Sequence, residues 1–345
     1  MESALTDFLT EQRRRLTDID APALAPVAET ATDFVLNGGK RIRPAFAYWG
    51  YRAAGGADSD AVVAGVASLE LLQASALMHD DLMDDSDTRR GEPAVHRRFA
   101  AAHRAAGWHG DPDHFGSCAA VLLGDLCLAW SDEMFTNSGL PMNTVAAARP
   151  DFDRMRTEVS AGQYLDVLTS VQRDTTTDRA RKVARYKSAK YTVERPLLLG
   201  AALAGAGSEV RDCYSAFGLP LGEAFQLRDD VLGVFGDPSQ TGKPAGDDLR
   251  EGKHTYLVAR AYEAATAAQR AVLDQRLGDP HLDHAGVDEL RGVITDTGAL
   301  TATEHRIDLL AAETDEQLHR GRHVLVPAAM AVLADLAESA VRRKL

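Results

Sequence analysis

The sequence predicts an all-α protein folded as a single domain over residues 1–345. Apolar residues return every three or four positions along Ala- and Leu-rich segments, as in Leu5, Phe8, Leu9 and Leu16, and this is the period of an amphipathic helix. Long runs in which Val, Ile and Thr alternate with polar residues, the pattern of strands, are missing. No linker divides the chain, so we expect one helical bundle.

Each predicted helix follows from this spacing and from the break that ends it. The later boundaries fall at short Gly-, Pro- or Ser-containing breaks: Gly55-Gly56, Gly107 to Gly116, Ser138 to Pro141, Gly205 to Gly207, Gly236 to Gly252 and Gly278 to Gly286. We expect helices over approximately 4–18, 23–37, 44–54, 58–84, 93–106, 115–137, 142–171, 175–205, 208–235 and 250–277, with three more to the end.

Composition excludes several functional classes. A net charge of −13 argues against a nucleic-acid partner, because phosphate backbones demand a basic surface. Three cysteines without CxxC spacing indicate neither a disulfide framework nor a zinc site. The first residues lack the apolar region of a secretory signal, and the longest apolar stretch, 196–206, is too short for a membrane helix. We therefore expect a cytoplasmic protein without a membrane span.

The first chemical signal is the acidic group Asp80, Asp81, Asp84 and Asp85. Positions 80 and 84 are one helical turn apart, as are 81 and 85, so we expect four carboxylates on one face. Two carboxylates about 6 Å apart repel by roughly 3 kcal/mol at a dielectric near 20, which favours a bound cation such as Mg²⁺. A solvated acidic helix end is the alternative, but several apolar turns precede the acids and favour the mouth of a buried cavity.

A second acidic pair, Asp229 and Asp230, again follows an apolar helical run. Cations accompany both acidic groups: the segment GGKRIRP (38–44) holds three, and Arg89 and Arg90 follow the first acids. Arginine forks and lysine point charges are typical phosphate ligands. Further candidates are Lys187, Lys243 and Lys253. A cap or a solvated surface is the alternative for any one of these residues, whereas the set together favours a diphosphate site.

These motifs resemble those of the trans-isoprenyl diphosphate synthases, the polyprenyl synthetase family, from about residue 30 to 260. The matching segments, in the order of the family, are GGKRIRP, DDLMD followed by RRG, GQYLD (162–166), YKSAKYT (186–192) and FQLRDD (225–230). The arrangement is most similar to bacterial geranylgeranyl diphosphate synthases. The resemblance implies an isoprenoid synthase-type helical bundle around a central apolar cavity, a homodimer, and Mg²⁺-dependent head-to-tail condensation of isopentenyl diphosphate with an allylic diphosphate.

The resemblance also implies a role for each candidate residue. Three Mg²⁺ ions per active site would be coordinated by Asp80, Asp84 and Asp229, with Asp81 and Asp230 in support. The allylic diphosphate would be held by Arg89, Lys187, Lys243 and Lys253. Isopentenyl diphosphate would be bound by Lys40, Arg43, Gln73 and Arg90. The reacting carbons would be bordered by Phe225 and Gln226.

Two positions bear on how the chain differs within the family. The second motif of the family reads DDxxD, but Gly233 stands at its fifth position, and Asp237, Asp247 or Asp248 would compensate through water. One turn before Asp80 lie Ser75 and Ala76, where family members that stop at fifteen carbons carry bulky aromatics. Small side chains leave the tunnel open, so we expect a twenty-carbon product.

Three alternatives remain for the function. In the first, the protein is a synthase whose product is farnesyl diphosphate or a longer prenyl diphosphate. In the second, it is a class I terpene cyclase. In the third, it is the non-catalytic subunit of a heteromeric synthase. The GGKRIRP segment counts against a cyclase, which binds no second diphosphate. Both intact Asp-Asp pairs count against a non-catalytic subunit, although Gly233 gives that alternative some support.

Overall fold

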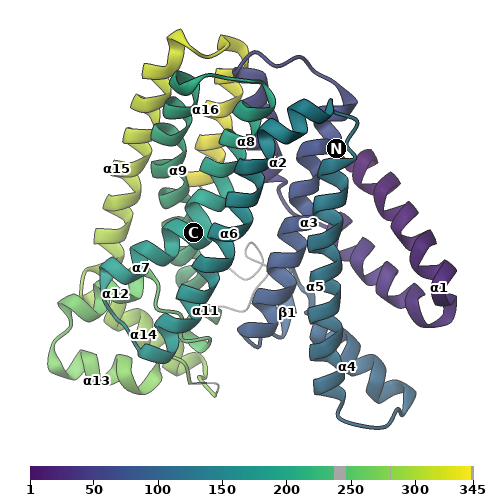
Figure 1. The fold of residues 1–345 in the computed structure, drawn as a ribbon. Helices are drawn as coiled ribbons and strands as arrows, with labels where there is room; N and C mark the ends of the chain where they lie inside the picture. The colour runs from purple at the N-terminus through teal and green to yellow at the C-terminus, as the bar shows by residue number, and fades with distance from the viewer. Residues whose placement is uncertain (237–245, 280, 343–345) are drawn as a thin grey trace. The chain divides into compact units, whose positions relative to one another are not determined.

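The computed structural model describes residues 1–236, 246–279 and 281–342 and is built almost entirely of helices (Figure 1). The prediction of an all-α fold is confirmed. The described strands are β1 (Thr88–Arg89) and β2 (Glu92–Pro93), which pair antiparallel. Contacts divide the chain into two compact units, unit 1 (Met1–Tyr48 and Ala57–Ala147) and unit 2 (Trp49–Gly56 and Ala148–Leu345). One domain over 1–345 stays a prediction.

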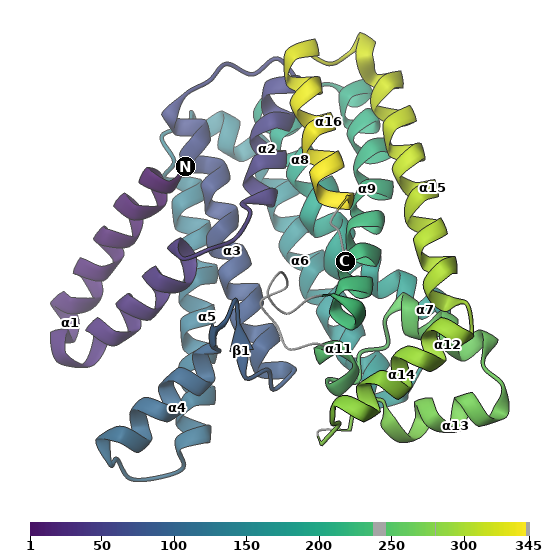
Figure 2. The ribbon, with the colours of Figure 1, turned by 180° about the vertical axis from the view of Figure 1, so that it is seen from behind.

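Unit 1 is centred on the pair α3 and α5, which lie side by side in Figures 1 and 2. Its helices are α1 (Glu2–Leu36), α3 (Asp60–Met83), α4 (Val95–Ala106), α5 (Pro112–Thr136) and the first part of α2 (Ile42–Ala53) and of α6 (Met142–Gln172). Buried residues of α1, α3 and α5, such as Leu9, Leu71 and Leu123, form one core. α3 is therefore held on two sides by apolar packing, which fixes the direction of its acidic end.

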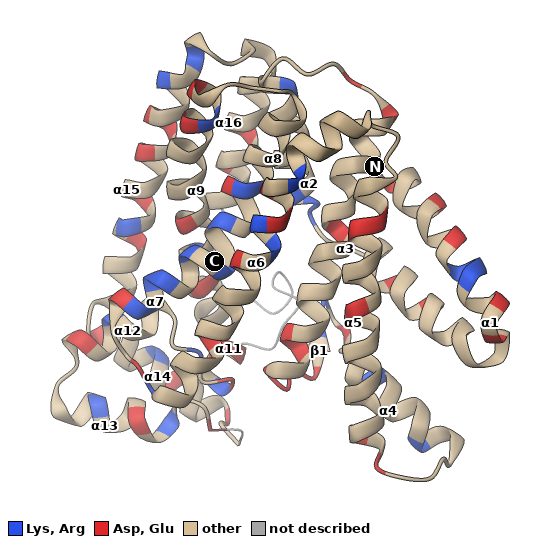
Figure 3. Ribbon diagram, viewed as in Figure 1, with Lys and Arg blue, Asp and Glu red and all other residues tan. Residues whose placement is uncertain are grey.

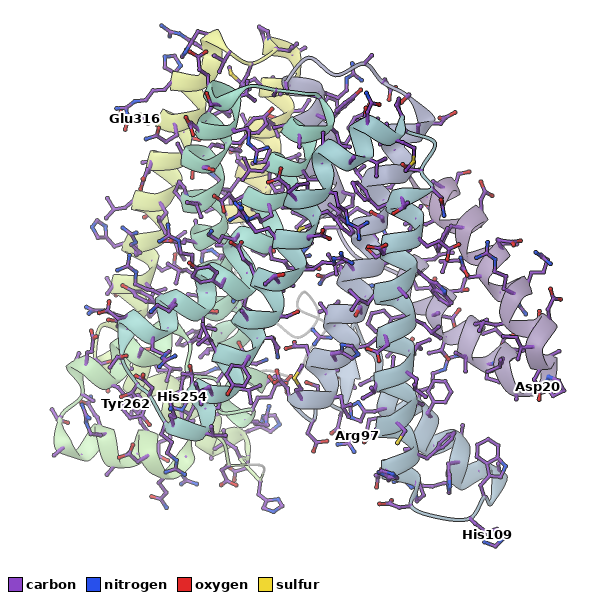
Figure 4. The ribbon with its side chains drawn as sticks, viewed as in Figure 1. Asp20, Arg97, His109, His254, Tyr262 and Glu316 are labelled. Carbon is purple, nitrogen blue, oxygen red and sulfur yellow. The ribbon has the colours of Figure 1, made fainter. Side chains whose placement is uncertain are left out.

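The two helices predicted at 4–18 and 23–37 are the two arms of α1. Asp20 has non-helical torsion angles (φ −157°, ψ 97°), and its Oδ1 accepts a hydrogen bond from the Ala23 amide at 3.2 Å. This is an N-cap for the second arm, which begins near Pro22. Asp20 lies at the bend of α1 in Figure 4.

Unit 2 is centred on α9 (Ser208–Phe235), which packs against η1 (Ala184–Glu194) and α15 (Ala299–Arg320). The remaining helices are α7 (Thr177–Val183), α8 (Arg195–Leu203), α11 (Asp247–Arg250), α12 (Tyr256–Ala264), α13 (Ala267–Arg276), α14 (His284–Asp296), the 3₁₀ turn η2 (Gly321–His323) and α16 (Pro327–Val341). Gly222 allows the close approach of α9 to η1, because a Cβ there would lie 2.5 Å from the Ala189 carbonyl oxygen.

Two predicted helices differ in detail from the structure. The helix expected at 175–205 contains η1, a π-helical segment that ends just before Pro196. Proline lacks the N–H that would bond the carbonyl four residues earlier, so regular α-helical bonding is interrupted there. The single helix expected at 250–277 is wrong: Gly252, with φ 70°, follows α11, and a capping box at Thr266 starts α13.

Two described helices, α3 and α5, are long and apolar enough by length and composition to cross a membrane. Core helices of soluble proteins meet the same criterion, and most of the apolar window of α3 is buried inside unit 1. The expected absence of a membrane span stays a prediction.

Candidate active site

The first acidic motif lies at the C-terminal end of α3, where acidic ribbon segments gather beside β1 in Figure 3. Asp80 and Asp81 lie in the last turn of the helix, and Asp84 is its C-cap. The predicted common face of four carboxylates is wrong for Asp85. The helix ends at Met83, and Asp85 adopts a left-handed conformation (φ 54°) with a side chain that is 81% exposed.

The carboxylate of Asp85 is instead paired with Arg97 of α4, with 2.8 Å between Oδ1 and Nη2. Asp87 pairs with the same guanidinium, 2.9 Å from its Nε. These exposed acids are neutralised outside the α3 turn. The carboxylates that the helix keeps together are therefore those of Asp80, Asp81 and Asp84.

Arg89 neutralises the most buried of these acids. The Asp81 side chain is 1% exposed, and its Oδ1 accepts hydrogen bonds from Nε of Arg89 at 2.7 Å and from Nη2. The Asp80 carboxylate lies 3.6 Å from the same guanidinium. An ionised, desolvated carboxylate needs such a partner, so Arg89 both stabilises Asp81 and places a cation beside Asp80.

The first residues of the GGKRIRP segment, 38–41, form a loop that Arg90 covers, and α2 begins at Ile42. Gly38 and Gly39 both have φ 95°, and a Cβ at Gly39 would lie 3.0 Å from Nη2 of Arg90. Nη1 of Arg90 donates to the carbonyl oxygens of Phe34 and Asn37, at 3.2 and 3.3 Å. Glycine is required here both for the backbone conformation and for the close approach of the guanidinium. The structure thus places Arg90, a predicted ligand of isopentenyl diphosphate, against the two glycines that precede Lys40.

Arg41 and Glu70 are functional candidates that sequence reasoning missed. Arg41 has a positive φ of 52°, and its Nη1 forms an ion pair with Glu70, a side chain only 6% exposed on α3. Its Nη2 donates to the carbonyl oxygens of Val35 and Leu36, at 2.6 and 3.2 Å. The loop is thus tied to the end of α1 and to α3. The sequence signal that could have found this pair is Glu70, a lone acid inside the apolar run ASLELLQ (67–73).

Gln73 lies one turn beyond Glu70 on α3. Its Oε1 is buried and has no hydrogen-bond partner among the residues that the structure describes. An unsatisfied buried oxygen is rare in proteins and is typical of an atom that binds a ligand or water. Ser75 is 3% exposed and Ala76 is half-buried on the same helix, whereas Lys40 is exposed and Arg43 half-buried.

In unit 2, Lys187 is held by Asp166 of the GQYLD motif. The Lys187 Nζ lies 2.6 Å from Asp166 Oδ2, and both side chains are about four-fifths buried. A Cβ at Gly162 would lie 2.6 Å from the Lys187 Cα, so this glycine lets α6 approach η1. The motif therefore has two physical functions: Gly162 allows α6 to contact η1, and Asp166 orients Lys187.

The second acidic motif lies near the C-terminal end of α9. Asp230 is 4% exposed and accepts a hydrogen bond at 2.7 Å from Nε2 of Gln226, one turn earlier. Burial, together with the negative charges of Asp248 and Asp229, raises the pKa of Asp230 to about 8. Phe225 is 8% exposed beside this motif. A nearby cation would relieve the repulsion.

Lys253 is the second predicted lysine that lies in unit 2 and pairs with acids there. Its Nζ lies 3.7 Å from Asp248 Oδ1 and also contacts Glu251. Lys243 and Asp237 lie outside the described residues.

The donor set of both motifs fits Mg²⁺. All its members are carboxylate oxygens, the hard ligands that Mg²⁺ prefers, and Mg²⁺ uses one or two of them together with water and phosphate oxygens. Within residues 1–236, 246–279 and 281–342, no three His, Cys, Asp or Glu side chains converge as a metal cage. Carboxylates of this kind can hold an ion that also takes phosphate oxygens. The candidates are Asp80 and Asp84 in unit 1 and, separately, Asp229 in unit 2.

Comparisons with known proteins agree with this chemistry. The family model described as polyprenyl synthetase matches residues 25–294. The chain is similar to the solved geranylgeranyl pyrophosphate synthase from Corynebacterium glutamicum complexed with isoprenyl diphosphate and magnesium, with 40% identity, a TM-score of 0.95 and coverage of 99% of this chain and 97% of that chain. Geranylfarnesyl diphosphate synthase from Aeropyrum pernix is 33% identical over 78% of this chain and 79% of its own length. The (2E,6E)-farnesyl diphosphate synthase from Mycobacterium bovis is 32% identical over 83% of this chain and 77% of its own length.

Proposed function

The chain belongs to the polyprenyl synthetase family and is a trans-prenyltransferase, and from this premise we propose that it condenses isopentenyl diphosphate with an allylic diphosphate to form geranylgeranyl diphosphate. The observation that carries the proposal is the 40% identity, over nearly the whole of both chains, to a geranylgeranyl pyrophosphate synthase. The small residues Ser75 and Ala76 before Asp80 support a twenty-carbon product. Relatives named for fifteen- and twenty-five-carbon products define the competing outcomes.

For the allylic diphosphate we propose that Asp80, Asp84 and Asp229 act through three Mg²⁺ ions, which would neutralise charge on the leaving diphosphate. Asp81 keeps Arg89 oriented by its hydrogen bonds, and Asp166 does the same for Lys187. Both cations then meet the diphosphate without reorganising, which is the condition under which electrostatic stabilisation is largest. Lys243 and Lys253 complete the proposed set of cations.

For isopentenyl diphosphate we propose Lys40, Arg43, Gln73 and Arg90. Arg90 lies over Gly38 and Gly39, so its guanidinium and the loop act as one cationic surface. The buried Oε1 of Gln73 is satisfied when it accepts a hydrogen bond from a water molecule bound beside the diphosphate.

The chemical step is an ionisation followed by addition. The allylic C–O bond breaks, its electrons leave with the diphosphate, and the double bond of isopentenyl diphosphate attacks the allylic cation. Loss of a proton to the departing diphosphate restores a double bond in a chain five carbons longer. Phe225 and Gln226 would border the reacting carbons and exclude water from the cation.

We further propose that the chain functions as one domain, in the cytoplasm, as a homodimer. An exposed apolar surface on α5 supports a second copy as partner: Val121 is 43% exposed and Leu122 is 64% exposed. No nucleic acid or membrane span is part of the proposal.

The test is product analysis with the purified protein, Mg²⁺, isopentenyl diphosphate and each of the C5, C10 and C15 allylic diphosphates. We expect a twenty-carbon product, and Ser75→Phe should shorten it because an aromatic ring in this buried position fills the tunnel. Ser75→Ala is the matched control and should leave the length of the product unchanged. A cyclised product without elongation would show a terpene cyclase, and no turnover by the chain alone would show a non-catalytic subunit.

A further inference from the structure

A pocket of about 220 Å³ lies in unit 2 and uses none of the residues that the proposed function assigns. It is bordered by the segment that follows α6, by α13, and by residues just before and within α12. Its charged and aromatic side chains are those of Arg173, His254, Tyr262, Arg270 and Asp274. One water molecule takes up about 30 Å³ in the liquid, so the pocket has room for a ligand of several heavy atoms.

His254 and Tyr262 form the aromatic wall of this pocket. Their rings are stacked, with centroids 6.5 Å apart and an angle of 29° between the planes, and the two residues lie close together in Figure 4. Nδ1 of His254 is buried and has no hydrogen-bond partner among the residues that the structure describes. Buried polar atoms are nearly always hydrogen-bonded, and a protonated Nδ1 donates to an oxygen. This nitrogen is therefore suited to an oxygen atom of a ligand.

Arg270 of α13 is held at the pocket by Tyr262. Its Nη2 donates to the carbonyl oxygen of Tyr262 at 2.7 Å, and its guanidinium carbon lies 5.8 Å from the centroid of the Tyr262 ring. Asp274 lies one turn later on α13, a spacing at which ion pairs often form, but these two described side chains form none. Asp274 is instead the hydrogen-bond partner of the Tyr262 hydroxyl. The contacts of Arg270 thus fix its guanidinium without neutralising its charge.

Arg173 brings a second guanidinium to the same pocket. Its backbone is left-handed (φ 49°) in the turn after α6, where its amide donates to the carbonyl oxygen of Ser170 at 3.2 Å. Its side chain forms no hydrogen bond or ion pair with another residue of the described ranges. Burial and Asp274 raise the pKa of Tyr262, whereas the charges of Arg173 and Arg270 act in the opposite direction. Two positive charges and one negative charge thus act on one hydroxyl, which is a positive surplus in a protein of net charge −13.

We propose that this pocket binds a phosphate dianion. Arg173 and Arg270 supply the positive charge, because planar guanidinium groups match pairs of phosphate oxygens, and Nδ1 of His254 supplies one further hydrogen bond. The bound anion joins the turn after α6 to α13. The ligand is either inorganic phosphate or the phosphate group of an ester. This inference goes beyond the proposed function, because the pocket shares no residue with it.

The experiment is equilibrium dialysis of the purified protein against radiolabelled inorganic phosphate, in EDTA and a chloride buffer of low ionic strength. EDTA removes the divalent ions on which diphosphate binding at the acidic motifs is proposed to depend. We expect one phosphate per chain, with a Kd on the order of 1 mM, as for a small ion held by a few charged hydrogen bonds. A second arm uses glycerol 3-phosphate. Tighter binding of this ester assigns the phosphate group of an ester, weaker binding assigns the free ion, and both results support the site.

Five variants locate the bound phosphate. Arg173→Ala and Arg270→Ala should each raise the Kd about tenfold or more, since each removes a charged hydrogen-bond donor. His254→Phe keeps an aromatic ring and removes Nδ1, so it should raise the Kd about threefold to tenfold. Arg276→Ala is the matched control, because this arginine also belongs to α13 but lies in an exposed ion pair outside the pocket. Lys187→Ala alters the proposed active site and should leave the phosphate Kd unchanged.

Folding is followed by the thermal midpoint of each variant without phosphate. If Arg270→Ala fails to fold, Arg270→Gln replaces it, because the amide still donates to the Tyr262 carbonyl oxygen while the charge is lost. Added phosphate should raise the midpoint of the unaltered protein and of Arg276→Ala more than that of Arg173→Ala. Absence of binding, or equal Kd values in the pocket variants and the unaltered protein, overturns the inference. Loss of binding in Lys187→Ala rather than in the pocket variants overturns it as well.

Discussion

The two acidic motifs have the same sequence, Asp-Asp at the end of an apolar helix, but they are neutralised differently. In the first, the buried Asp81 is paired with Arg89, eight residues later in the same unit. In the second, the buried Asp230 has the neutral amide of Gln226 as its hydrogen-bond partner, and its pKa is raised to about 8. The buried acid of the first motif is thus paired with a cation of the chain, whereas the buried acid of the second motif accepts a hydrogen bond from a neutral amide.

This difference has a physical consequence. A carboxylate paired with arginine is ionised and ordered before any ligand binds, so the first motif is ready to accept an ion. A carboxylate buried beside other acids gains most when a cation arrives. We therefore expect the first motif to depend on its arginine for stability, and the second to depend on metal.

The largest effect is expected for Arg89→Ala. The variant leaves Asp81 buried without its guanidinium, which should lower the free energy of unfolding by about 3–5 kcal/mol. It also removes a proposed diphosphate ligand, which should reduce kcat/KM by on the order of 100-fold to 1,000-fold. Chemical denaturation and steady-state kinetics measure the two effects.

The matched control for this variant is Arg97→Ala. Arg97 also pairs with two acids of the same segment, Asp85 and Asp87, but their side chains are 81% and 83% exposed. Exposed ion pairs contribute at most about 1 kcal/mol. Equal losses of stability in the two variants would contradict the distinction between buried and exposed acids.

A smaller effect is expected from pH in the metal-free protein. The pKa of Asp230 is raised from 3.8 to about 8 in the folded state, so the folded form keeps a proton that the unfolded form releases. Stability should therefore fall as pH rises from about 4 to about 8, by up to about 1.4 kcal/mol per pH unit from this group. Asp230→Asn cannot titrate and removes this contribution.

The measurement is chemical denaturation in EDTA at pH 6 and pH 8, for the unaltered protein and for Asp230→Asn. We expect the stability difference between the two pH values to be larger for the unaltered protein, and Mg²⁺ with diphosphate to reduce it. Identical pH dependence in the two proteins would show that the second motif is already neutralised by the chain.

The sequence was sufficient for the features that depend on local spacing. The helices that carry both motifs are confirmed, since several turns of apolar residues at helical spacing define α3 and α9. The helix end at Met83 was not predictable to the residue, so Asp85 was misplaced. The pair of Arg41 and Glu70 was missed, because no local pattern shows that these distant residues meet. For the same reason the sequence could not choose among Asp237, Asp247 and Asp248 as the neighbour of Gly233.

The smallest effect on activity is expected at Arg41, whose partner Glu70 is another buried acid neutralised by arginine in unit 1. Arg41 anchors the GGKRIRP loop through the carbonyl oxygens of Val35 and Leu36. Arg41→Ala should therefore raise KM for isopentenyl diphosphate about tenfold, equivalent to about 1.4 kcal/mol. The kcat value should change less than about threefold, because the loop is displaced while the acidic motif is intact.

Stability separates anchoring from simple loss of charge. Arg41→Ala leaves Glu70 buried and unpaired, whereas the double variant Arg41→Ala/Glu70→Leu removes both charges and should recover most of the lost stability without recovering KM. Arg98→Ala is the control, since it breaks an exposed pair with Asp33 and should change neither quantity. If kcat falls as much as KM rises, Arg41 acts on the acidic end of α3 rather than on the loop, and the first motif then depends on two arginines instead of one.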